Sequence, residues 1–247
     1  MKNSGKIHRI VVGATCYADA RSVIEISAFL AESIKGELQA VLIEEEAVFS
    51  LSARPAARVT LSGGMSRPVT AQAMMDAFQR DAAAFEKAVR ETAAKRAVDW
   101  SFETRRGEFP VALNHNLTTG DLIVFGYQVP GRLPGEFLVV DYTNDLDVSL
   151  IELAANVAHE MKRPLHVVLL RKSPDHAIKV SDHARSRMEQ LAVNLTILDQ
   201  DNSQSALLDA VRHARVATVM VSAELVRDVG LARLLENARC PVIVFTG

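Results

Sequence analysis

The chain has 247 residues, of which 49% are hydrophobic and 23% are charged, a balance typical of a globular protein with one large or two small domains. The formal net charge is −2, so the composition gives no reason to expect a nucleic-acid partner. The two cysteines, Cys16 and Cys240, do not make a disulfide framework, and no apolar run reaches the roughly 18 residues of a membrane span. We therefore expect a cytoplasmic protein that binds neither nucleic acid nor membrane.

Short apolar runs alternate with helical patterns along the first half of the chain. Strands are predicted over residues 9–13, 38–43, 99–104 and 121–125, and helices over residues 19–34, 71–97 and 110–116. Asp19 stands where a helix N-cap is expected. Such an alternation is typical of a parallel sheet covered by helices.

The second half of the chain repeats this order. Strands are predicted over residues 137–141, 165–170, 194–198, 217–221 and 242–244, and helices over residues 147–161, 178–191 and 203–215. Gly13 and Asp141 end the first strands of the two halves, and the candidate N-caps Asp19 and Asp147 follow them at the same separation along the chain. The repeat predicts two tandem doubly wound, Rossmann-like α/β units.

The repeat also predicts domain boundaries. The first unit covers residues 1–128, a Pro/Gly linker covers 129–135, and the second unit covers 136–247. The first unit stops after its fourth strand, which leaves that strand as a bare edge. The other half, the linker or a second chain must cover this edge, and on this ground we expect a homodimer.

An insertion over residues 44–70 separates the second strand of the first unit from its long helix. It begins with Glu44, Glu45 and Glu46 and continues with apolar residues, and Gly63–Gly64 is a candidate hinge. A segment of this length is usually functional or disordered. It is a candidate lid over the crevice of the first unit, or a contact for another subunit or a protein partner.

The stretch Leu138-Val139-Val140-Asp141, the helix after it and the closing Cys240-Pro241-Val242-Ile243-Val244 resemble universal stress proteins. The resemblance implies a unit of five parallel strands with helices on both sides. Members that bind ATP carry Gly-x-x-Gly, nine residues, then Gly and Ser or Thr after strand four, because glycines let backbone N–H groups approach phosphate. The matching segment, residues 222–231, lacks the paired glycines and is shorter, and Asp228 falls near the Gly-Ser position. We therefore expect no bound ATP and no other cofactor.

Four residues are candidate ligand contacts. In the family, an Asp at the end of strand one lies near the adenine or ribose; Asp141 matches that position, and Gly13 replaces the Asp in the first unit. The alternative for Asp141 is a cap of its own turn. Arg105 and Arg106 end the third strand of the first unit, and they are either an anion clamp or surface arginines.

Three further groups of residues are weaker candidates. Asp141, Asp145 and Asp147 have the ligand type that Mg²⁺ prefers, but a cap and a solvated turn explain two of them, so no metal is predicted. Cys16 precedes a helix, which can stabilise a thiolate, or it is a half-buried loop residue. His176 and His183 are seven residues apart, a spacing unlike that of zinc ligands on one helix.

No catalytic residue emerges from these patterns. We interpret the chain as a non-enzymatic, stress-response binding or regulatory scaffold that does not bind ATP in the usual way. The alternative is a nucleotide-binding or nucleotide-hydrolysing α/β protein that uses a non-standard crevice near Asp141.

Overall fold

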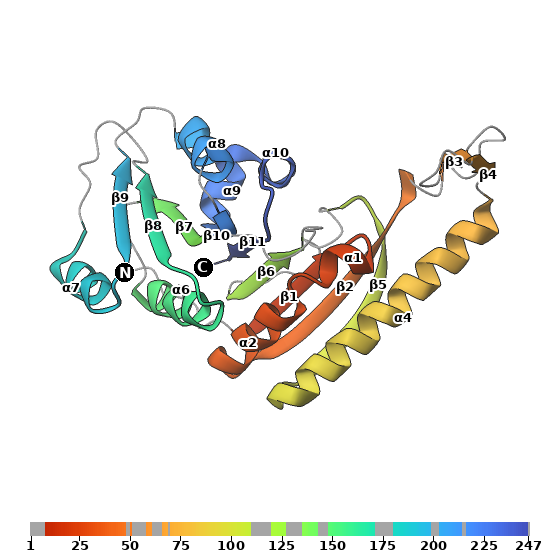
Figure 1. Ribbon diagram of the computed structural model, residues 1–247, viewed down its shortest axis with the longest axis horizontal. Helices are drawn as coiled ribbons and strands as arrows, with labels where there is room; N and C mark the ends of the chain where they lie inside the picture. The colour runs from red at the N-terminus through yellow and green to blue at the C-terminus, as the bar shows by residue number, and fades with distance from the viewer. Residues whose placement is uncertain are drawn as a thin grey trace.

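The computed structural model describes residues 8–47, 50, 58–60, 66–68, 70–109, 120–126, 135–142, 148–170, 180–198, 203–213 and 216–246. These residues form a nine-stranded sheet with helices on both faces, together with a separate two-stranded hairpin (Figure 1). The α/β class predicted from the sequence is confirmed.

The strands of the large sheet are β1 (Arg9–Ala14), β2 (Glu37–Glu45), β5 (Trp100–Gly107), β6 (Asp121–Phe125), β7 (Glu136–Tyr142), β8 (Leu165–Leu170), β9 (Asn194–Leu198), β10 (Val216–Ser222) and β11 (Val242–Phe245). Their spatial order is β5-β2-β1-β6-β11-β10-β7-β8-β9. Strands β1, β2, β5 and β6 pair in parallel and form the first set. Strands β7, β8, β9, β10 and β11 also pair in parallel and form the second set. The hairpin consists of β3 (Arg58–Thr60) and β4 (Ser66–Pro68).

The two sets of strands meet in an antiparallel pair, in which β6 lies beside β11. Ile243 is in register with Val124, and Val244 with Ile123. Backbone bonds extend this junction, because Gly120 donates to Thr246 over 2.9 Å. The edge that the sequence left bare is therefore covered by the last strand of the same chain, which removes the original reason to expect a homodimer.

The helices are α1 (Tyr17–Ala20), α2 (Ile24–Ile34), α4 (Ala71–Arg96), α6 (Val148–Glu160), α7 (Asp182–Gln190), α8 (Ser203–His213), α9 (Ala223–Val229) and α10 (Leu231–Asn237). Helices α2, α4 and α6 contribute to one buried cluster, and α8, α9 and α10 contribute to the other. Each cluster contains strand residues from both sets, so the two sets share one sheet and one pair of cores. No helix in these described segments is long and apolar enough to cross a membrane.

The first predicted helix is wrong in its start and in its continuity. Asp19 lies inside α1 and does not cap it, because α1 begins after Cys16. The chain then turns over residues 21–23, where the N–H of Val23 donates to the carbonyl of Ala20 over 3.0 Å, before α2 begins. The carboxylate of Asp81 on α4 accepts the N–H of Tyr17 over 3.2 Å, which fixes the start of α1. Two other predictions, the N-cap Asp147 and the helix over residues 110–116, lie outside the described residues.

Four turns from helix to strand have the same backbone conformation. Lys35, Ala97, Lys162 and Ala192 each follow a helix and have φ between 52° and 55°. This left-handed conformation commonly ends a helix, although glycine is usual there. Lys35 and Lys162 precede the second strand of their set, and Ala97 and Ala192 precede the third.

Candidate functional site

Ligands of open α/β sheets bind outside the carboxyl ends of the strands, where the strand order reverses. This sheet has two such points, one between β1 and β6 and the other between β7 and β10. Because β6 and β11 are antiparallel, the two points open at opposite ends of the sheet.

Helix α1 occupies the point between β1 and β6. Gly13 is buried in β1, in register with Val41 on one side and Phe125 on the other. Gly126 follows β6 and lies so close to α1 that an added Cβ would be 2.0 Å from the carbonyl oxygen of Asp19. The crevice at this point is therefore filled by protein backbone.

The point between β7 and β10 contains Asp141, which is only 8% exposed at the carboxyl end of β7. Asp145 and Asp147, which the sequence grouped with Asp141, lie outside the described residues. Beside Asp141, β10 ends at Ser222, and the helix α9 begins at the next residue.

Residues 222–231, the segment that lacks paired glycines, are thus largely helical. The hydroxyl oxygen of Ser222 accepts the N–H of Leu225 over 3.3 Å, so one of the first free amides of α9 already has a partner. Glu224 lies in the first turn of α9, where its negative charge opposes an anion. Gly230 follows α9 with φ of 87° and joins it to α10.

The structure separates Arg105 from Arg106. They are consecutive in β5, so their side chains leave opposite faces of the strand. Arg105 forms an ion pair with Glu103, and Arg106 forms one with Glu44 over 3.1 Å. Both guanidinium groups are therefore engaged with carboxylates and do not converge on a common point.

The four predicted contact residues do not share one crevice. Asp141 lies on β7, which is six strand positions from β5, or about 29 Å at the usual strand spacing. Gly13, Arg105 and Arg106 lie toward the carboxyl ends of the first set of strands, and Asp141 lies at the opposite end of the sheet. A single ligand held by Asp141 together with both arginines does not fit this arrangement.

Both cysteine thiols have a raised pKa. Burial raises the pKa of the half-buried Cys16, and burial raises the pKa of Cys240 to about 12. A reactive or redox-sensing thiol needs a lowered pKa. His183 is exposed on α7, and His176 lies outside the described residues. Within the described part of the chain, no three His, Cys, Asp or Glu side chains form a group that could hold a metal ion.

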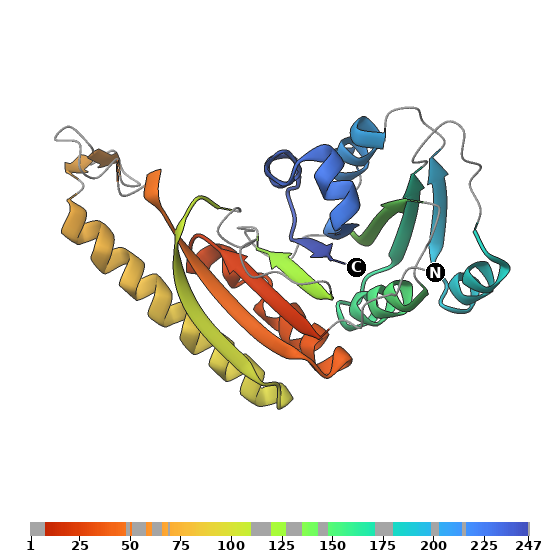
Figure 2. The same cartoon turned by 180° about the vertical axis from the view of Figure 1, so that it is seen from behind.

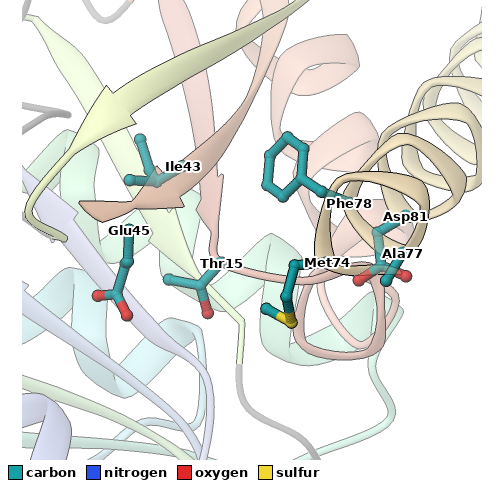
Figure 3. Close-up of a pocket in the computed structure, with 7 residues that line it drawn as sticks. All are labelled: Thr15, Ile43, Glu45, Met74, Ala77, Phe78 and Asp81. Carbon is teal, nitrogen blue, oxygen red and sulfur yellow. The ribbon is translucent and has the colours of Figure 1, made fainter. Parts of the chain in front are cut away.

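A cavity of about 220 Å³ lies where the carboxyl ends of β1 and β2 face α4 (Figure 3). It is lined by Thr15, Ile43, Glu45, Met74, Ala77, Phe78 and Asp81. The sequence analysis did not assign a site to this group. The only signal was the acidic run Glu44–Glu46 after the second strand, because Asp81 and Thr15 join Glu45 only in the folded chain.

Solved structures with a similar arrangement are universal stress proteins, the family that the sequence resembles. One from Archaeoglobus fulgidus DSM 4304 is 12% identical, with 96% of each chain covered and a TM-score of 0.47. A putative universal stress protein from Pseudomonas aeruginosa UCBPP-PA14 is 11% identical, with 97% of this chain and 93% of that chain covered and a TM-score of 0.44. A member of the family from Burkholderia pseudomallei is 10% identical, with 79% of this chain and 98% of that chain covered and a TM-score of 0.28. No protein-family model matches the sequence, and no curated protein matches it.

Proposed function

We propose that the chain is a non-enzymatic binding or regulatory protein of the universal-stress-protein type, active in the stress response, that does not bind ATP in the usual way. The observation that carries this proposal is the direct passage from β10 into α9 at Ser222. A phosphate site needs free backbone N–H groups in a glycine-rich loop before a helix. Here the chain offers a capped seven-residue helix with Glu224 in its first turn.

The repeated helix-to-strand turns support two tandem units, residues 1–128 and 136–247 joined by the linker 129–135. Lys35 and Lys162 have the same left-handed conformation, as do Ala97 and Ala192. The strand orders β5-β2-β1-β6 and β9-β8-β7-β10-β11 also correspond, apart from the fifth strand. On this view the first unit ends early, and β11 of the second unit takes the place beside β6.

Titration calorimetry with ATP, ADP and AMP in the presence of Mg²⁺ tests the proposal. We expect no heat of binding and, after prolonged incubation with ATP, no ADP or AMP in the mixture. Binding tighter than about 100 μM, equivalent to roughly 5.5 kcal/mol, would show that a glycine loop is dispensable in this fold.

The burial of Asp141 at the second switch point favours one other candidate, a nucleotide site at the carboxyl end of β7. If the calorimetry shows binding, Asp141→Asn distinguishes this site from a non-specific one. Loss of binding in Asp141→Asn, but not in the control Asp76→Asn at an exposed position of α4, would assign the nucleotide to this end of the sheet.

Two contacts with other molecules belong to the same proposal. The end strands of the large sheet are β5 and β9, and β9 is uncharged and carries Ile197, which is 40% exposed. An edge of this kind favours pairing with another strand, so we assign the homodimer contact to β9. The mass of the protein in solution tests this assignment.

The insertion 44–70 is a surface for a protein partner, because its hairpin β3–β4 projects beyond the start of α4, away from the large sheet (Figures 1 and 2). A shortened loop in place of residues 48–65 must then abolish binding of such a partner without lowering stability.

A further inference from the structure

The cavity beside α4 combines apolar and acidic walls. Met74, Ala77, Phe78 and Asp81 are spaced i, i+3, i+4 and i+7 along α4, so they lie on one face of that helix. Ile43 and Glu45 come from the end of β2, and Thr15 directly follows β1. Six of these seven side chains are at least partly exposed, so a small molecule can reach them from solvent.

Two carboxylates stand on opposite sides of this cavity. Figure 3 shows Glu45 on one side and Asp81 on the other, with Thr15 and Met74 between them. One oxygen of Asp81 accepts the N–H of Tyr17 over 3.2 Å. Among the described residues, neither the other oxygen of Asp81 nor the carboxylate of Glu45 has a hydrogen-bond or ion-pair partner.

The charge of the cavity walls determines whether a cation or an anion can bind there. The lining residues include two acidic side chains, and among the described lining residues none is basic. Phosphate or carboxylate ligands are repelled by such a wall, whereas a cation is attracted.

The size and apolar walls select the rest of the ligand. Ile43, Met74 and Phe78 offer a surface for methylene groups. A volume of about 220 Å³ is below the range of roughly 300–1,000 Å³ that drug-sized ligands occupy. A hydrated metal ion would leave the apolar wall without a partner, whereas a short aliphatic chain with a charge at each end matches both the wall and the carboxylates.

We propose that this cavity binds a small aliphatic diamine, with one ammonium group at Asp81, the other at Glu45, and the methylene chain along Met74 and Phe78. The site is independent of nucleotide binding, because it lies at the opposite end of the sheet from Asp141. The nucleotide titration tests the proposed function and a diamine titration tests this site, so either proposal can be wrong while the other stands.

Titration of the full chain with 1,4-diaminobutane tests the site, with n-butylamine, 1,4-butanediol and Mg²⁺ as comparison ligands. We expect the diamine to bind with a dissociation constant below about 1 mM, the monoamine to bind at least about tenfold more weakly, and the diol and Mg²⁺ not to compete. No diamine binding at about 10 mM, or equal binding of the diol, would overturn the proposal.

Variants locate the binding. Asp81→Asn keeps an oxygen that can accept the Tyr17 N–H, and Glu45→Gln keeps the size of its side chain, so both are expected to fold. Each must weaken diamine binding about tenfold or more. The control Asp76→Asn removes a charge from an exposed position of α4 outside the cavity, and it must leave the affinity within about twofold. Equal weakening by all three variants would mean a general attraction to an acidic helix and would refute a specific site.

Discussion

At the residue scale, polar side chains on one face of the sheet form a chain of contacts across four strands. Arg9 on β1 forms an ion pair with Asp121 on β6 over 2.5 Å, and it also donates to Gln39 on β2 over 3.2 Å. Gln39 then donates to Glu103 on β5 over 2.8 Å, and Glu103 pairs with Arg105. Asp121 is fully buried, and its carboxylate is the main reason that the pKa of Arg9 is raised. These contacts give Arg105 a structural role in this network.

The buried pair makes a sharp prediction for stability. Asp121→Ala leaves the Arg9 guanidinium without its main partner, and removal of one member of a buried ion pair costs about 3 kcal/mol or more. Urea unfolding followed by circular dichroism measures this loss. The control Glu91→Ala removes an exposed i,i+4 pair with Lys87, at 3.9 Å, and is expected to cost under about 0.5 kcal/mol. A similar small cost for both variants would contradict the role assigned to Asp121.

At the element scale, α1 decides what the first switch point can hold. It has only four residues, and the contacts at its ends come from elsewhere in the fold, from Asp81 on α4 and from the close approach of Gly126. A side chain at position 126 would collide with the backbone of Asp19, whose carbonyl carbon is 2.5 Å from the ideal Cβ. Backbone atoms cannot move aside as a flexible side chain can, so the whole helix would have to shift.

We therefore expect Gly126→Ala to destabilise the protein by about 2 kcal/mol, the cost typical of overpacking. Equilibrium urea unfolding gives the value. Ala18→Ser, an exposed change on the same helix, serves as the control and is expected to stay within about 0.5 kcal/mol of the parent chain. If Gly126→Ala unfolds like the control, α1 does not pack against β6 as described.

At the scale of the whole molecule, the two sets of strands are held together by more than the β6–β11 pair. Arg96 on α4 reaches Glu32 on α2 and Glu160 on α6, each over 2.7 Å, and its guanidinium lies 5.2 Å from the centre of the Phe29 ring. Glu32 and Glu160 lie near the ends of the helices that follow the first strand of each set. One arginine thus contacts a helix from each half of the chain.

The outer edges of this continuous sheet determine how the molecule can assemble. With β6 covered, we expect pairing of β9 with β9 of a second chain and a mass in solution of twice 27.0 kDa. Ile197→Lys places a charge on this edge and should give a monomer of unchanged stability. Light scattering after size-exclusion chromatography measures the mass at protein concentrations around 10 μM. Thr104→Lys on the exposed edge strand β5 is the matched control. A parent chain that is monomeric throughout, or a dimer that survives Ile197→Lys, would exclude this contact.

Much of the fold was predictable from local pattern. The apolar runs at 121–125 and 165–170 predicted β6 and β8 with the bounds that the structure has, because a buried strand needs consecutive apolar residues. Residues 194–198 likewise predicted the edge strand β9 with its observed bounds. The early start of the first helix was not predictable from local pattern, since the Asp81 carboxylate that holds Tyr17 comes from α4, a helix that follows α2, β2 and the insertion.

The sequence by itself determined the α/β class, the alternation of strands and helices, and the lack of a glycine loop at residues 222–231. Each of these depends on residue type and on spacing along a short stretch. Only the tertiary structure decided that β11 covers β6 in the opposite direction, which separates Asp141 from Arg105 and Arg106. It also brought Glu45, Asp81 and Thr15 around one cavity. Packing between elements sets the direction of the strands at a junction and brings distant side chains together. Local sequence patterns therefore do not predict either feature.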